Sequence, residues 1–386
     1  MSTLKYFFVR LYFLLISLGS YGQSVNLQDI GLMPNELPEC SGMAVIGENA
    51  IASINDSGND PEIFVLDTLG NIIHHTVFLG FSNNDWESIA YADGLLYIGD
   101  FGNNANKRTD LKIYIVDISR LLSEGLWAFK GEINFSFPDQ KAFPPADTAK
   151  YFDLEAMVVY KDSLYLFTKN RTKPFDGLSN CYSLSKKAGT NKAHKKGQIF
   201  TGQGLMPAYW VSGACLAGDE NPDLYLLGYD KIWRVRDYFN QSESLLKAEE
   251  FYMGSFGQRE AICILNQKFY IGEEKVASRN AKLYKAAIPD SPKGETAVIG
   301  ESLSIESKQF STQIELIVPD ANLQGQLYFE IYSQGGELIL KGKSKDCIIE
   351  GDKMFIDTKS LGLGSYILNT VLAGKPRAFL IKKTSN

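Results

Sequence analysis

The sequence of 386 residues is poor in several residue types on which common functional sites depend. It has three histidines, at positions 74, 75 and 194, and none of them has the spacing of a zinc ligand pair. It offers no Ser–His–Asp set, no glycine-rich loop that would cradle a phosphate, and no nucleotide-binding fingerprint. The net charge of −6 comes with no basic face, so nucleic acid is not expected as a partner.

Long hydrophobic runs are also scarce. The run near the start, Leu11–Leu18, follows two basic residues and precedes a small-residue cleavage pattern that ends at Gly22. This order is typical of a secretory signal peptide, so we assign residues 1–22 to one and expect the mature chain to begin near Gln23. No cysteine follows the run, which argues against lipoprotein processing, and no other stretch reaches the ~18 apolar residues of a membrane helix. The protein is therefore expected to be exported, without a transmembrane segment in the mature chain.

What the sequence does contain is a short pattern that recurs five times between Ser41 and Glu260. In each copy a Ser or Glu opens an apolar strand, and a second apolar strand then ends in a polar loop. The copies begin at intervals of 46, 68, 57 and 48 residues, which is typical of the four-stranded blades of a β-propeller. The five opening residues are Ser41, Glu87, Glu155, Ser212 and Glu260.

We therefore predict an all-β chain with a five-bladed β-propeller over residues 23–290. The fifth repeat lacks a clear fourth strand, so residues 25–32 are expected to form the outer edge of blade five and close the ring. A short helical turn is expected at residues 121–125. The lysine-rich run at residues 186–197 is interpreted as a solvated hairpin tip, and a binding patch is the alternative.

The five cysteines are an odd number without metal-type spacing. Cys215 and Cys263 occupy the same place in two successive repeats. They are interpreted as small core residues, and a disulfide between them is the alternative.

The chain changes character after the last repeat. Residues 291–308 hold Pro, Ser, Gly and Lys and are interpreted as a linker. Residues 309–386 contain short strands punctuated by glycine pairs, which predicts a small Ig-like β-sandwich.

The segment Phe329–Leu338 resembles the strand–turn–strand of the type A sorting domain of the Bacteroidetes type IX secretion system. Later segments resemble its remaining elements in order: Ile356–Leu361, Gly364–Leu368 and Phe379–Lys383. The resemblance covers residues 309–386, although the Asn-Pro that usually precedes the first strand is absent near Val318. It implies Sec export, passage through the outer membrane with the type IX machinery as partner, and usually removal of the domain.

In a propeller the start of each first strand and the end of its antiparallel second strand lie at the same face. The five opening residues are therefore expected to ring one mouth of the central channel. Carboxylates that converge there repel one another, so either they become protonated or a cation neutralises them. Oxygen-only ligands favour Ca²⁺, which makes all five opening residues candidate calcium ligands. The alternative is that the glutamates accept hydrogen bonds from backbone amides of neighbouring blades.

The order Ser, Glu, Glu, Ser, Glu at these spacings resembles the central calcium ring of the five-bladed calcium-activated apyrase family. Residues 87–99 and 155–159 and the Asn55-Asp56 loop carry this resemblance, and little else matches over residues 41–288. It supports the blade count and the ion more than it supports nucleotide hydrolysis, because proteins that share a propeller often differ in chemistry.

Polar loops surround the expected mouth. The candidate ligand-binding residues in them are Asn55, Asp56, Asp100, Asn103, Lys169 and Arg171. Turns rich in Asn, Asp and Gly, and an exposed basic loop, are the alternative interpretations. Asp85 and Trp86 either present an acid and an aromatic ring at the rim, or Trp86 packs between blades.

Three functions are consistent with these patterns, of which the third is a structural lectin-like module that uses rim aromatic residues. The first is a secreted or surface protein that binds Ca²⁺ in the channel and an unidentified small molecule or glycan at its mouth. The second is a Ca²⁺-dependent extracellular phosphohydrolase, in which the ion would polarise a phosphoryl oxygen. In that case Asp56, Asp100 or Glu273 would activate water. The sequence does not decide whether the protein is an enzyme.

Overall fold

The structure is a computed structural model that describes residues 23–204, 206–241, 244–276, 279–289, 304–305, 307, 309–318, 327–333, 338–372 and 375–385. The predicted signal peptide and most of the predicted linker lie outside these residues. Among the described residues, no helix has the length and apolar character needed to cross a membrane.

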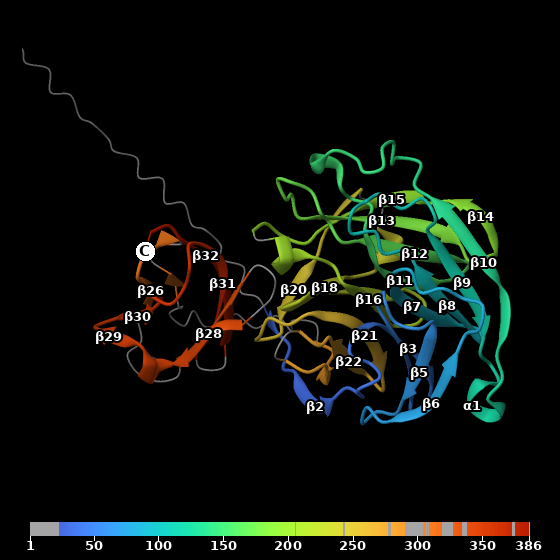
Figure 1. Cartoon of the computed structure of the whole chain (residues 1–386), viewed down its shortest axis with the longest axis horizontal. Coiled ribbons are helices and arrows are strands. Elements are labelled where there is room, and N and C mark those ends of the chain that lie inside the picture. Colours follow the sequence, from blue (N-terminus) through green and yellow to red (C-terminus); the bar gives the residue numbers. More distant parts are fainter. Residues whose placement is uncertain are drawn as a thin grey trace, which may run out of the picture.

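The described strands form seven sheets, and five of these contain four strands that follow one another in antiparallel order, which we call ring sheets 1 to 5 (Figure 1). Ring sheet 1 holds β3 (Cys40–Gly47), β4 (Ala50–Asn55), β5 (Glu62–Leu66) and β6 (Ile72–Val77). Ring sheet 2 holds β7 (Trp86–Ala92), β8 (Leu95–Asp100), β9 (Lys112–Asp117) and β10 (Ala128–Ser136). Ring sheet 3 holds β11 (Leu154–Tyr160), β12 (Ser163–Thr168), β13 (Leu178–Ser185) and β15 (His194–Phe200).

The remaining two ring sheets follow the same plan. Ring sheet 4 holds β16 (Gly213–Ala217), β17 (Asp223–Leu227), β18 (Lys231–Val235) and β20 (Glu249–Tyr252). Ring sheet 5 holds β21 (Arg259–Leu265), β22 (Lys268–Glu273), β23 (Lys282–Ala287) and β2 (Gln28–Leu32).

The first strands of the ring sheets contact one another in a closed circle. β3 contacts β7, β7 contacts β11, β11 contacts β16, β16 contacts β21, and β21 contacts β3 again. Sheets that radiate from an axis lined by their first strands are the arrangement of a β-propeller, so the fold is a β-propeller.

The N-terminal strand closes this ring, because β2 pairs antiparallel with β23 as the outer strand of ring sheet 5. This is the pairing expected for residues 25–32. Three short strands also add parallel fifth strands to other ring sheets: β14 (Gly189–Lys192) on β10, β19 (Leu245–Lys247) on β15, and β1 (Gln23–Ser24) on β20. Part of the lysine-rich run is therefore a paired strand as well as a hairpin tip.

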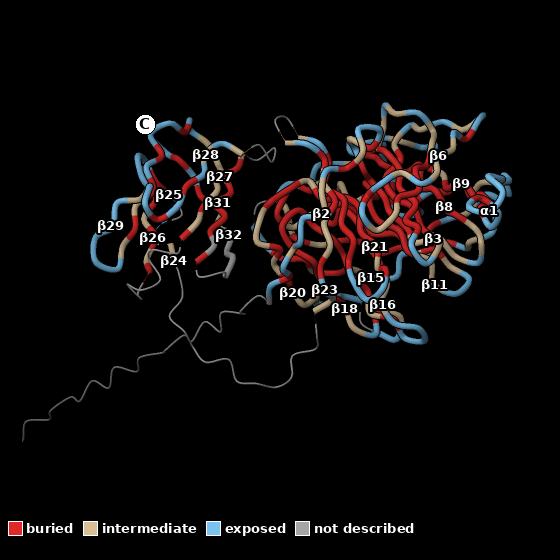
Figure 2. The backbone as a smooth tube through the Cα atoms, turned by 90° about the horizontal axis from the view of Figure 1, so that it is seen from below, coloured by how far each residue is buried: buried red, intermediate tan, exposed pale blue. Residues whose placement is uncertain are grey.

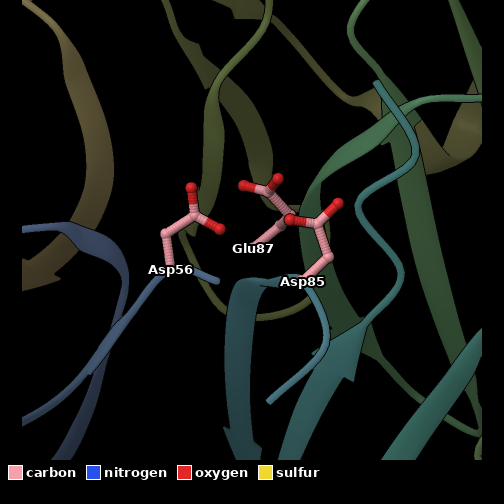
Figure 3. Close-up of side chains that lie close together, drawn as sticks. All are labelled: Asp56, Asp85 and Glu87. Carbon is pink, nitrogen blue, oxygen red and sulfur yellow. The ribbon is translucent and has the colours of Figure 1, made fainter. Parts of the chain in front are cut away.

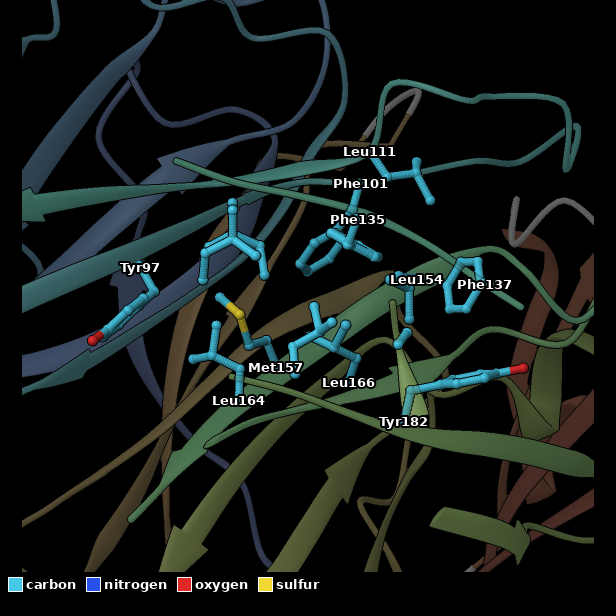
Figure 4. Packing of buried hydrophobic residues seen from close by; sticks show 14 of the residues in the cluster. Tyr97, Phe101, Leu111, Phe135, Phe137, Leu154, Met157, Leu164, Leu166 and Tyr182 are labelled. Carbon is cyan, nitrogen blue, oxygen red and sulfur yellow. The ribbon is translucent and has the colours of Figure 1, made fainter. Parts of the chain in front are cut away.

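The core of the ring lies between neighbouring sheets, where buried strands form its centre (Figure 2). In one cluster Tyr97 of ring sheet 2 packs with Met157 and Leu166 of ring sheet 3 (Figure 4). Cys215 and Cys263 are buried with free thiols, so they are core residues and form no disulfide. The helical segments are short: α1 (Leu121–Glu124), where a helical turn was expected, and the 3₁₀ turns Asp147–Ala149, Met206–Tyr209, Tyr238–Asn240 and Ser344–Asp346.

The C-terminal residues form two further sheets that share one core. The first holds β24 (Ser304–Ile305), β26 (Gln313–Ile317), β30 (Lys353–Asp357) and β29 (Ile348–Glu350). The second holds β25 (Gln309–Phe310), β32 (Lys375–Lys383), β31 (Gly364–Leu372), β27 (Leu327–Ser333) and β28 (Leu338–Lys343). Ile314 and Met354 of one sheet pack with Phe329 and Leu368 of the other. We call this unit the C-terminal sandwich.

Candidate functional site

A β-bulge at the start of the first strand frees one side chain in four of the ring sheets. In the pairing of β7 with β8, the residues on either side of Glu87 have partners but Glu87 has none. Glu155, Glu260 and Ser41 are skipped in the same way in their own sheets. Because a bulge bends the strand and re-aims the extra side chain, the opening residue of each of these four repeats does not follow the alternation of its neighbours.

The three glutamates converge as a result. One carboxylate oxygen from each of Glu87, Glu155 and Glu260 lies within 4.8 Å of the other two, and all three residues are buried. Burial, and then the charge of Glu155, raises the pKa of Glu87 well above its usual range. Burial likewise raises the pKa of Glu155, although Lys169 opposes this shift. We call these three residues the axial cluster.

Lys169 supplies a positive charge inside the axial cluster. Its Nζ lies 3.0 Å from Oε1 of Glu155 and 3.3 Å from Oε1 of Glu260, and only 4% of the residue is exposed. Burial opposes ionisation of this lysine, but Glu155 and Glu260 raise its pKa well above the usual value. The sequence placed Lys169 in a peripheral loop, whereas the structure makes it the counter-ion of the cluster.

Glu260 is the best-satisfied member of the cluster. Its Oε1 accepts hydrogen bonds from the hydroxyl of Tyr229 at 2.7 Å and from Lys169. Burial opposes ionisation, but Lys169 and these hydrogen bonds lower the pKa of Glu260 below its usual value. Glu155 also has Arg171 at 3.6 Å, yet its Oε2 has no hydrogen-bond partner among the described residues.

Glu87 belongs to a second acidic group as well. Carboxylate oxygens of Asp56, Asp85 and Glu87 also lie within 4.8 Å of one another, and Figure 3 shows the three side chains pointing toward a common space. Asp56 and Asp85 are half-buried, and burial, with Glu260 and Asp85, raises the pKa of Asp56 to about 7. We call these three residues the rim cluster. No hydrogen bond or ion pair from a described residue reaches the carboxylate of Glu87, which both clusters share.

Gly102 keeps the space beside the rim cluster open. A Cβ atom at this position would lie 2.5 Å from Oδ2 of Asp85 and 2.5 Å from Oε1 of Glu87. Any side chain here would press on both carboxylates, so glycine is needed for their close approach.

The residue that follows the second strand of a ring sheet is a second position that reaches the clusters. Asp56, Lys169 and Glu274 hold this position after β4, β12 and β22. The backbone N–H of each donates to a carbonyl two residues before the opening residue of its sheet: that of Glu39, Asp153 and Gln258, each at 2.8 Å. Burial, and then Glu260, raises the pKa of Glu274 well above its usual range, which is opposite in direction to the shift of Glu260 beside it.

The residues predicted from the sequence include Asp56 and Lys169 at this position, but also the residue before it in three sheets, and the side chains of those three are held elsewhere. Glu273 lies 3.2 Å from Arg259 and 3.9 Å from Arg279, and Asp100 lies 2.8 Å from Arg108. Asn55 accepts from the N–H of Glu39 and donates to the carbonyl of Glu36. Successive residues of a strand point to opposite sides. A residue that reaches the clusters is therefore next to one whose side chain points away from them and holds the surrounding structure. Glu274 could have been predicted from the sequence, because it holds the same position in its repeat as Asp56 and Lys169 hold in theirs.

Asn103 is also a supporting residue. Its Oδ1 accepts from the N–H groups of Lys107 and Arg108, and its Nδ2 donates to the carbonyl of Phe152. These bonds fold the loop that carries Gly102. Trp86 is fully buried and packs in the core, as the packing interpretation expected.

The two serines hold neighbouring sheets together. The hydroxyl of Ser41 donates to the carbonyl of Trp86 at 2.7 Å, and that of Ser212 donates to the carbonyl of Arg259 at 2.6 Å. Each bond ties one ring sheet to the residue just before the opening glutamate of the next. The hydroxyls are thus engaged between sheets, which differs from the five equivalent ligands that the sequence suggested.

Aromatic and basic side chains flank the axial cluster. The guanidinium of Arg171 lies 4.5 Å from the ring centre of Trp210, and Nζ of Lys169 lies 5.2 Å from it. Arg171 also pairs with Asp153 at 2.6 Å. Since Trp210 is half-buried and Arg171 is partly exposed, these two groups form an accessible edge of the site.

Comparisons with known proteins do not identify a family. No family of proteins and no curated protein matches the sequence. Similar solved structures include PorZ, an essential surface component of the type-IX secretion system of Porphyromonas gingivalis, at 10% identity and a TM-score of 0.29, over 89% of this chain and 51% of that chain. The chain thus spans about half the length of PorZ.

For two other similar structures, the alignment with this chain covers most of the other protein. The calcium-binding protein regucalcin from Agrobacterium tumefaciens is 10% identical over 69% of this chain and 95% of that chain, with a TM-score of 0.35. A GH43_1 enzyme from Xanthomonas citri is 11% identical over 72% and 94%, with a TM-score of 0.40. Similarity at this level assigns no function, which must be argued from the residues of this chain.

Proposed function

We propose that this chain is a five-bladed propeller protein that acts outside the cell and binds one calcium ion at the mouth of its channel, where the ion holds a ligand. The carboxylate of Glu87 carries the proposal, because it is buried, shared by the axial and rim clusters, and without a partner among the described residues. An unpaired buried carboxylate is costly when ionised, and a hard cation with oxygen ligands removes that cost.

The ion is expected in the rim cluster, between Glu87, Asp56 and Asp85. The ammonium of Lys169 already lies close to Glu155 and Glu260, and a divalent ion placed among all three would be repelled by it. Carboxylate oxygens are the ligands that Ca²⁺ prefers, and its usual six to eight ligands leave positions for water and for a bound ligand. This places the ion beside the predicted ring of opening residues.

A calcium titration tests the proposal. Isothermal titration of the metal-free full-length protein is expected to give one site per chain, and Glu87→Gln should weaken it at least 100-fold. Gly102→Ala should also weaken binding, because its Cβ enters the space between Asp85 and Glu87. Glu132→Gln, a half-exposed glutamate on β10, is the matched control and should bind as the wild type does. No binding at millimolar calcium, or an unchanged Glu87→Gln, would refute the site.

A calcium-dependent phosphohydrolase is the second candidate function. Its support is Asp56, whose pKa of about 7 suits a general base at neutral pH. Arg171 is a partly exposed cation at the edge of the site that could contact a phosphoryl group. Asp100 and Glu273 are paired with arginines, so Asp56 is the remaining base among the earlier candidates.

Assays of the hydrolysis of nucleotides and other phosphoesters test this alternative. If the protein is an enzyme, turnover should require calcium, and Asp56→Asn should lower kcat at least 100-fold. Asp60→Asn, an exposed acid in the same loop, is the control. An absence of turnover over a broad phosphoester panel, with calcium bound, would leave the ligand-binding function.

For export, we propose that the C-terminal sandwich is a type IX sorting domain. The support is the resemblance of residues 309–386 to that domain, together with the signal-peptide pattern of residues 1–22. Deletion of residues 309–386 is expected to retain the propeller inside the cell envelope, as fractionation would measure. Normal release of the truncated protein would contradict the proposal.

A further inference from the structure

The C-terminal sandwich contacts the ring beside the candidate site. Tyr332 and Ile367 are paired residues on β27 and β31, and they form one buried cluster with Tyr229 and Phe256 of the ring. Tyr332 is 1% exposed and Ile367 is 2% exposed. Neither belongs to the core that the two sheets of the sandwich share, so their burial comes from contact with the ring.

The contact continues as a row of aromatic rings toward the axial cluster. The ring centre of Tyr332 lies 5.5 Å from that of Phe256, and Phe256 meets Tyr229 edge-on at 5.5 Å. Tyr229 in turn meets Trp210 edge-on at 6.0 Å. Aromatic pairs in such geometry attract one another beyond the effect of the area they bury. The row therefore fixes the position of the Tyr229 ring.

The far end of this row touches the acidic residues. The hydroxyl of Tyr229 donates to Oε1 of Glu260 at 2.7 Å, and its ring centre lies 5.5 Å from Nζ of Lys169. The position of Tyr229 thus depends on Phe256 at one side and on the axial cluster at the other. A change at Tyr332 reaches the axial cluster through two rings, those of Phe256 and Tyr229.

We propose that the surface formed by Trp210, Tyr229 and Phe256 is a docking surface for an aromatic side chain, that Tyr332 of the C-terminal sandwich occupies it, and that this docking weakens cation binding at the mouth. The second half of this proposal rests on the calcium function proposed above. While the sandwich is docked, Tyr229 is held on Glu260, and its hydrogen bond, at 2.7 Å, is the shortest of the three that keep Oε1 of Glu260 from turning toward the ion. When the sandwich leaves, Tyr229 loses its outer packing and Glu260 gains freedom to support the cation.

The expected coupling is modest and reciprocal. Loosening one hydrogen bond to a charged group should tighten calcium binding by about tenfold. By thermodynamic linkage, calcium must weaken docking by the same factor. A sandwich that is removed during export would therefore leave a ring with higher calcium affinity than its precursor.

The test uses the full chain with Tyr332→Ser and Ile367→Ser combined. Tyr328→Ser is the matched control, since Tyr328 lies on the same strand and donates to the same glutamate, Glu330, but is absent from the contact cluster. Access of acrylamide to Trp210, obtained by comparison with Trp210→Phe, reports undocking without any metal. Titration calorimetry then gives the calcium affinity, and thermal melting verifies that each variant is folded.

The double variant is expected to show at least twofold stronger quenching of Trp210 and about tenfold tighter calcium binding, with the control unchanged. A folded double variant with unchanged quenching would overturn the docking surface. Stronger quenching with calcium affinity within twofold of the wild type would overturn the coupling. If neither protein binds calcium, the proposed calcium function and the coupling both fail, while stronger quenching would still establish the docking surface. Should the double variant not fold, Tyr332→Ser alone supplies the same readouts.

Discussion

Glu260 of the axial cluster and Glu87, which the axial and rim clusters share, are the same residue type at equivalent bulges, yet their carboxylates have different surroundings. Glu260 receives a lysine, a tyrosine hydroxyl and Gln258, and its pKa is lowered. Glu87, at the equivalent bulge two sheets away, receives none of these, and burial and neighbouring acids raise its pKa. The repeat fixes where a carboxylate stands, whereas the residue that follows the second strand of a sheet decides whether it is paired.

This difference indicates which side of the channel mouth an added cation would stabilise. Lys169 follows the second strand of ring sheet 3 and neutralises its side of the mouth, while Asp56 in the same position of ring sheet 1 adds a further acid. One side thus carries its own counter-ion, and the other has an excess of carboxylates. Substitutions that equalise or reverse the charge balance of the two sides of the mouth should test this comparison directly.

The largest effect is expected from Lys169→Met, which removes the counter-ion and leaves Glu155 and Glu260 both buried without it. Removal of one partner of a buried ion pair costs about 3–5 kcal/mol, and denaturant unfolding in a calcium chelator at pH 8 should measure that loss. Calcium should then restore more stability than it adds to the wild type. Lys107→Met, an exposed lysine, is the control, and a loss below about 1 kcal/mol would mean that the ammonium does not stabilise the cluster.

A second test makes the same substitution on both sides. Glu260→Gln should lose about 2–3 kcal/mol of stability, the scale of hydrogen bonds to a charged group, because Lys169 and Tyr229 lose their shared acceptor. Glu87→Gln should instead gain stability in a calcium chelator, since it removes an unpartnered buried acid. Changes of opposite sign in the free energy of unfolding, measured with denaturant at pH 8, would establish that the two sides of the mouth differ. Equal losses in the two variants would show that the two sides are alike.

The third prediction concerns pH, through Asp56. Its pKa of about 7 in the folded protein exceeds the ordinary value of 3.8, so the folded state binds the proton more strongly than the unfolded state. Without calcium, the contribution of Asp56 to stability should therefore fall as pH rises from about 4 to 7. Calcium needs the ionised form, so its affinity should decrease about tenfold per pH unit below 7.

Calorimetry in buffers of different ionisation enthalpy would count the proton that calcium releases from Asp56. Asp56→Asn should weaken binding and flatten its pH dependence, whereas Asp60→Asn should change neither. A wild-type affinity that is constant between pH 6 and 8 would exclude Asp56 as a ligand that must lose a proton.

The sequence predicted the convergence of Glu87, Glu155 and Glu260, because equivalent starts of radiating strands must meet near one axis. It also predicted the closing role of residues 25–32, since a ring sheet without an outer strand has to take one from elsewhere. These inferences need only the period of the repeat and the antiparallel order of its strands. The parallel fifth strands, such as β14, were not predictable in this way, because they pair across sheets without a periodic signal.

The finer details of the site depend on positions that differ by one residue. Glu273 and Glu274 are adjacent and have the same chemistry, and the alternation of side chains directs Glu273 to Arg259 and Glu274 to the cluster. Lys169 has a flexible side chain whose direction the sequence does not specify, so its place between two glutamates followed only from the packing. The contact of Tyr332 with Phe256 joins distant segments and carries no local pattern at all.

The smallest predicted effect separates the two roles available to the serines. Ser41→Ala and Ser212→Ala each remove a hydroxyl that donates to a carbonyl of the next ring sheet, so each should lower stability by about 1 kcal/mol, the usual net contribution of such a bond. Calcium affinity should stay within twofold, and Ser123→Ala, on an exposed turn, should change neither quantity. A fivefold or larger loss of calcium affinity would instead make a serine hydroxyl an ion ligand, because an inter-sheet hydrogen bond has no reason to alter binding that strongly. The comparison between the clusters would then have to include all five opening residues, since the ion would depend on ligands from the whole ring and not only from its rim side.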